Sequence, residues 1–142
     1  MKIMLAILGG LAGSSAIASD FCTKIPFDPE LPAGLNGRYE VIGRDPITRA
    51  AYSGHLTVTL EKDSYGVARV VNGKTVKGQA WIVMCGFVEK IMYLRVEYDT
   101  APSTLAACLF RMDGDNYYRV TCKIDDGKNS WRGLEAWFQN KD

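Results

Sequence analysis

The sequence has very little histidine: His55 is the single one among 142 residues. A Ser-His-Asp or Cys-His mechanism would have to use it, but no G-x-S-x-G segment is present to expose a nucleophilic serine. His55 falls on the polar phase of an alternating segment, which is typical of an exposed strand residue. One histidine does not make a metal site, and no cofactor motif accompanies it. We therefore predict no catalytic residue, no metal ligand and no cofactor.

Paired carboxylates are the other route to hydrolysis that needs few residues, and the sequence has two pairs. Asp113 and Asp115 surround a glycine, and Asp125 and Asp126 precede one. Acid–glycine combinations are typical of hairpin turns, and D-G-D-N lacks the alternating acids and distal glutamate of a calcium loop. We interpret both pairs as turn residues. A carboxylate-dependent hydrolase stays open as the one enzyme class that these residues allow.

An excess of charge of either sign is also missing. The chain has 17 Lys+Arg against 16 Asp+Glu, and the basic residues are scattered along it. A nucleic-acid binder needs a basic stripe on its surface, so nucleic acid is not a predicted partner. A membrane span needs about 20 consecutive apolar residues, and no run of that length is present, so no span is predicted.

The beginning of the chain has the features of a secretory signal peptide. Lys2 precedes an apolar run over residues 3–11, and A-I-A at 16–18 is a small-x-small cleavage site. We predict a signal peptide at residues 1–18, followed by a mature chain with equal numbers of basic and acidic residues. The protein is then expected to be periplasmic or secreted.

The four cysteines predict two disulfides. Their spacing contains no C-x-x-C pair, which argues against a zinc knuckle or a redox site, and exported thiols are normally oxidised. Cys108 and Cys122 lie on two expected strands joined by a turn at 113–116, so they fall nearly opposite each other. That pairing leaves Cys22 with Cys85, which would hold the N-terminal arm against the body of the protein.

Alternating apolar and polar residues predict strands along most of the chain. Residues 19–35 form an extended N-terminal arm, because three prolines between 23 and 35 exclude a helix. Residues 36–142 form one all-β domain, a single antiparallel meander of about eight strands that closes into a small barrel or a curved sandwich. The expected strands are 36–43, 52–62, 64–71, 75–85, 91–98, 104–112, 117–124 and 131–139.

Three short motifs resemble a pattern of small exported bacterial β proteins of unassigned function. They are G-R-Y-E-V-I-G at 37–43, Y-S-G at 52–54 and G-L-E at 133–135. Gly37-Arg38-Tyr39 is also similar to the G-x-W that opens lipocalin-type barrels, with tyrosine in place of tryptophan. The resemblance spans most of residues 36–139. It implies a minimal, distantly lipocalin- or avidin-like barrel, and it implies neither an activity nor ligand-binding residues.

Aromatic and arginine side chains suggest a binding surface, because such residues dominate binding hot spots. Both phases of the last expected strand are partly apolar, so one phase can be core while the other carries two tryptophans beside an acid. The alternative is that the tryptophan phase packs under the N-terminal arm. The candidate surface residues are Trp131, Trp137, Arg132, Tyr117 and Phe87.

These observations favour a non-enzymatic protein-binding module outside the cytoplasm, such as a hydrolase inhibitor, a toxin-immunity protein or a host-contact protein. The alternative is a carrier with a lumen for a small apolar ligand. Side-chain volume favours the first, because the expected lumen residues are large enough to fill an eight-stranded barrel. Those residues are Tyr39, Val41, Leu56, Val58, Leu94, Val96 and Val120.

Overall fold

The structure of the protein is a computed structural model that describes residues 21–114, 117–128 and 132–140. The predicted signal peptide and Trp131 lie outside these residues. All regular structure in the described part is β, as predicted, and no helix there has the length and apolarity to cross a membrane. The strands are β1 (Cys22–Lys24), β2 (Gly37–Arg44), β3 (Ala51–Leu60), β4 (Tyr65–Val71), β5 (Lys74–Cys85), β6 (Ile91–Tyr98), β7 (Thr104–Met112), β8 (Tyr118–Asp125) and β9 (Gly133–Gln139).

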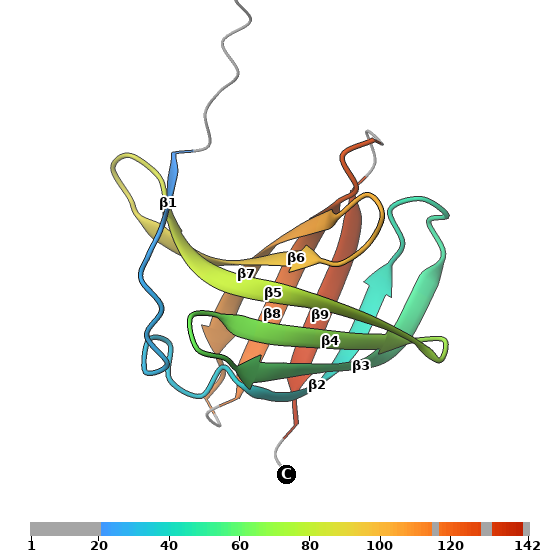
Figure 1. Cartoon of the computed structure of the whole chain (residues 1–142), viewed down its shortest axis with the longest axis horizontal. Coiled ribbons are helices and arrows are strands. Elements are labelled where there is room, and N and C mark those ends of the chain that lie inside the picture. The colour runs from blue at the N-terminus through green and yellow to red at the C-terminus, as the bar shows by residue number, and fades with distance from the viewer. Residues whose placement is uncertain (1–20, 115–116, 129–131, 141–142) are drawn as a thin grey trace, which may run out of the picture.

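Eight antiparallel strands close into a barrel (Figure 1). The strand order is β1-β5-β4-β3-β2-β9-β8-β7-β6, and β5 also pairs with β6, which closes the ring. The predicted meander is therefore confirmed, and closure gives each of the eight barrel strands a neighbour on both sides over at least part of its length. The short strand β1 is an addition that the sequence did not predict. It pairs with residues 83–85 of β5, beyond Ala80, which is the partner of the first residue of β4.

Large apolar side chains of the inward phase fill the barrel. The seven residues that the sequence placed inside are all buried in the core, as alternation requires. Tyr65, Tyr98 and Trp137 are also fully or almost fully buried there. Aromatic rings occupy much of the interior of an eight-stranded barrel, which has room for little more than its own side chains.

The N-terminal arm closes one end of the barrel. Leu35 is buried and accepts a hydrogen bond from the Tyr39 hydroxyl, and the Tyr118 hydroxyl donates to the carbonyl of Ala33 at 3.0 Å. Phe27 packs edge-on against Tyr65, with 5.1 Å between the ring centroids. The arm therefore covers this end of the barrel with apolar contacts and with backbone carbonyls that accept hydrogen bonds from tyrosine hydroxyls.

Both predicted disulfides are present. Cys108 and Cys122 face each other across β7 and β8 inside the barrel. Cys22 and Cys85 join β1 to β5, so they hold the arm against the wall. Each pair sits directly opposite in its strand register, which brings the two Cβ atoms as close as a disulfide needs.

Candidate functional site

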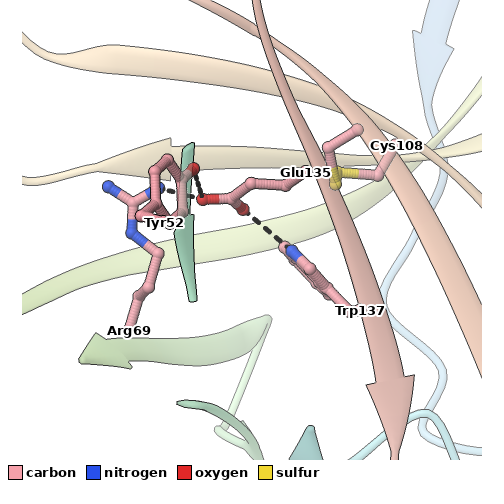
Figure 2. The surroundings of a disulfide bond; sticks show 6 residues. Tyr52, Arg69, Cys108, Glu135 and Trp137 are labelled. Atoms are coloured by element: carbon pink, nitrogen blue, oxygen red, sulfur yellow. Dashed lines mark hydrogen bonds and ion pairs between the residues drawn. A yellow bond between two sulfur atoms is a disulfide. The ribbon is translucent and has the colours of Figure 1, made fainter. Parts of the chain in front are cut away.

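A polar cluster lies inside the barrel (Figure 2). It lies toward the end opposite the arm, because its residues flank Gly43 near the end of β2, whereas the arm contacts Tyr39 near the beginning of that strand. Its centre is Glu135 on β9, whose side chain is completely buried. The Arg69 guanidinium forms an ion pair with Oε1, and the Tyr52 hydroxyl donates to the same oxygen. The indole Nε1–H of Trp137 donates to Oε2 at 2.8 Å. Both carboxylate oxygens therefore have partners, which is the condition for burying a charge.

The three sequence motifs converge on this cluster. Gly43 ends the first motif and pairs with Tyr52 on one side and with Glu135 on the other. The ring of Tyr52 lies across Gly43, where a Cβ would come within 2.4 Å of the ring. A side chain at position 43 would therefore displace Tyr52 from Glu135. The pattern thus marks the supports of a buried carboxylate, which inspection of the sequence alone did not reveal.

Burial and charge keep the protons of the cluster in place. Burial raises the pKa of Tyr52, and the charge of Glu135 raises it further. Burial also raises the pKa of Tyr98 well above its ordinary value. Burial lowers the pKa of Arg69, but the charges of Glu135, Tyr98 and Tyr52 outweigh this and raise it overall. The tyrosines stay protonated and Arg69 stays a cation.

Tyr98 completes the cluster through its ring. The Arg69 guanidinium carbon lies 4.4 Å from the Tyr98 ring centroid, which is a cation–π contact. The charge of Glu135 contributes to the raised pKa of Tyr98, but the Tyr98 hydroxyl makes no hydrogen bond of regular geometry within the described part of the chain. The cluster holds an ion pair and two protonated phenols, and its carboxylate is closed off from solvent.

Three of the four acidic residues assigned to turns are in the described part of the chain, and Asp115 lies outside it. Asp125 and Asp126 each accept a hydrogen bond from the backbone N–H two residues later. Asp113 pairs with Arg119 at 2.9 Å on the surface. His55 is exposed on β3, in the predicted polar phase. Within residues 21–114, 117–128 and 132–140, no group of three or more His, Cys, Asp or Glu is placed to hold a metal ion.

The structure does not gather the predicted surface residues into one site. Trp137 is 0% exposed and lies inside the barrel, so its assignment to a binding surface is wrong. Trp137 and Glu135 alternate with more exposed residues on β9 and share its inward phase, where Glu135 has buried partners. Phe87 is 73% exposed at the β5–β6 tip and contacts Phe21. Tyr117 precedes β8, and Arg132 precedes β9 at the opposite end of the barrel.

The outward phase of β9 belongs to an apolar surface, which we call the outer apolar face. It consists of Ile42 on β2, Leu109 on β7, and Leu134 and Phe138 on β9. These side chains are 53%, 46%, 50% and 39% exposed, respectively. Ile42 pairs with Ala136 of β9, which in turn pairs with Thr121 of β8. The face is therefore continuous across four neighbouring strands.

A hollow of about 910 Å³ lies against this face. Small residues at the centre (Ala107, Thr121 and Ala136) lie among larger ones at the margin. Arg44 and Lys123 also line the hollow, and neither has an ion-pair partner among the described residues. The molecule thus presents a hollow with an apolar floor and cations at its rim.

Sequence reasoning missed this face because it took the tryptophan phase of the last strand as the exposed one. The sequence nevertheless contains apolar residues in the phases that face outward. Leu134 and Phe138 share one phase of β9, and Ile42 lies among charged residues in the outward phase of β2. These signals become a surface only when the register places β2, β9, β8 and β7 side by side.

Comparison with known proteins identifies the architecture. No family model and no curated protein matches this sequence. Among solved structures the chain is similar to one described as a redesigned beta barrel, with a TM-score of 0.50 and 11% sequence identity. The match covers 76% of this chain and 92% of that chain. At this identity the likeness shows the fold alone, a small β-barrel.

Proposed function

We propose that this protein is an exported, non-enzymatic binding module that contacts a partner protein through the outer apolar face. The observation that carries the proposal is the contrast between a filled lumen and an exposed apolar surface. Large contiguous apolar patches on the surface of a soluble protein are typical of interaction sites. The two disulfides are compatible with an oxidising compartment outside the cytoplasm.

The charges around the face indicate the kind of partner. Arg44 and Lys123 border the hollow without an acidic partner among the described residues. Complementary charge steers two proteins together and fixes their register. The expected partner surface therefore carries an apolar protrusion with carboxylates beside it. An inhibitor, an immunity protein or a host-contact protein would each use such a surface.

The carrier function is less well supported, because Glu135, Trp137 and the Cys108–Cys122 disulfide occupy the interior. The hydrolase function is also less well supported, because Asp113, Asp125 and Asp126 are engaged in turns and a surface ion pair.

Site-specific photocrosslinking in the producing cells tests the proposal. A benzophenone amino acid replaces Ile42 or Leu134 on the outer apolar face. The control position is the exposed Gln79 on β5, which lies across the barrel from β9. The expected result is one partner polypeptide crosslinked at 42 and at 134 but not at 79. The R44E/K123E double variant should lose that product. The same product from all three positions, or from 79 alone, would contradict the proposal.

A further inference from the structure

Strands β6 and β7 separate toward the arm end of the barrel (Figure 1). They pair from Leu94–Tyr98 against Thr104–Cys108 and no farther. β6 nevertheless continues in register with β5 back to Ile91, and β7 continues with β8 to Met112. The segments Ile91–Tyr93 and Leu109–Met112 thus border an opening in the wall, which we call the open seam.

The facing edges of the open seam have no strand partner within the described part of the chain. A strand edge presents backbone N–H and C=O groups that bind another strand readily. Over Leu109–Met112 the far side of β7 is occupied by β8, so the free side faces the opening. Four residues of extended chain span about 13 Å, which is enough to pair with a short peptide segment.

The opening has space beside these edges. A hollow of about 740 Å³ is lined by both edges of the seam, with Lys90 and Arg119 close by. Its lining includes inward side chains, Met92 and Phe110, as well as outward ones such as Leu109. The hollow therefore reaches between the strands toward the core.

Charge at the seam favours an acidic occupant. Arg111 lies directly opposite Arg119 in the register of β7 and β8, and like charges in that position are destabilising. Arg119 has Asp113 as a partner at 2.9 Å, whereas Arg111 and Lys90 have no ion pair among the described residues. A carboxylate beside Arg111 would relieve this repulsion.

The geometry points to the open seam as a site where an extended segment of the partner protein adds as a strand along β7. The segment carries apolar residues in the phase that faces Phe110 and Met112, and acidic residues in the phase beside Arg111. Main-chain hydrogen bonds provide affinity in this mode of recognition, and alternate side chains provide specificity. The inference rests on the proposed function, because Leu109 lies in both the outer apolar face and the seam.

Defined peptides test this inference on the mature protein with both disulfides intact. The probe is acetyl-Val-Asp-Ile-Glu-Val-amide carrying a fluorophore. One control has lysine in place of both acids. A second control is N-methylated at alternate residues, so that one backbone edge cannot donate. Anisotropy gives the affinities, and hydrogen exchange gives the protection of amides in residues 91–93 and 109–112.

The acidic peptide should bind, and it should protect seam amides. Both control peptides should bind about tenfold more weakly or worse. R111E should lose affinity to a similar extent, while the matched variant R38E on β2 should not. Equal binding of the acidic and N-methylated peptides, protection confined to other strands, or no binding would overturn the inference. So would protection of the same amides by self-association in the absence of peptide.

The two experiments distinguish failure of the seam inference from failure of the proposed function. If no peptide adds at the seam but crosslinking at 42 and 134 still finds the partner, the face stands and the seam is excluded. If peptides protect the seam but no partner is crosslinked at 42 or 134, the proposed function fails.

Discussion

The wall formed by β2, β9, β8 and β7 carries apolar side chains on both sides, but the two sides differ in how the charges beside these side chains are paired. Inside, Glu135 has a hydrogen-bonding or ionic partner at each oxygen. Outside, Arg44 and Lys123 stand beside exposed apolar side chains without ion pairs among the described residues. The buried charge of Glu135 is therefore matched on the side that holds the fold, whereas Arg44 and Lys123 on the outer side are the cations to which the proposed function assigns a partner.

The largest effect on stability is expected from E135A, and L134A on the opposite side of β9 is its matched control. E135A leaves Arg69 buried without its counter-ion and should lower the free energy of unfolding by about 3–5 kcal/mol. L134A removes a half-exposed side chain and should change it by about 0.5 kcal/mol or less. Urea denaturation of the oxidised protein measures both. Equal losses would remove the proposed difference between the two sides.

The disulfides sharpen the comparison, because one lies inside the barrel and the other holds the arm outside. Removing the Cys22–Cys85 link, with a sequence separation of 63, should cost about 4 kcal/mol, and removing Cys108–Cys122, with a separation of 14, about 3 kcal/mol. Thermal or urea unfolding of the two double-alanine variants gives the values. A much larger loss for the shorter loop would show that packing inside the barrel outweighs chain entropy.

Alkaline pH should lower the free energy of unfolding through Tyr98. The folded pKa of Tyr98 is raised above the value of about 10 in an unfolded chain. The unfolded state therefore loses the Tyr98 proton first, and stability that is fully present below pH 10 falls as pH rises above it. The contribution is about 1.4 kcal/mol per pH unit. Unfolding measured between pH 9 and about pH 11 should show a smaller slope for Y98F. An unchanged slope would mean that Tyr98 does not titrate as its burial requires.

The smallest effect on stability is expected on the outer apolar face. I42T and L134T keep the strand pattern and replace exposed apolar groups, so unfolding should change by about 0.5 kcal/mol or less for each. The double variant should nevertheless elute earlier in hydrophobic-interaction chromatography. A loss of several kcal/mol would show that these side chains belong to the folded core.

The sequence predicts the fold well because its signals are local. Alternation defines the eight barrel strands to within a few residues, and the cysteine positions predict both disulfides. The site is harder to predict. Hot-spot residue types predict a surface role for Trp137, but Trp137 shares the inward phase of β9 with Glu135. The partners that bury Glu135 there, Arg69 and Tyr52, are distant in sequence. The open seam depends on where β6 and β7 stop pairing, which no local pattern encodes.

Native mass spectrometry of the protein recovered from the producing cells tests the central claim most directly. If the lumen is filled and the outer face binds, the bound species should be a polypeptide, and the I42T/L134T double variant should lose it. A small apolar adduct that survives in the folded protein, leaves on unfolding and persists in that variant would place the ligand in the lumen and contradict the account.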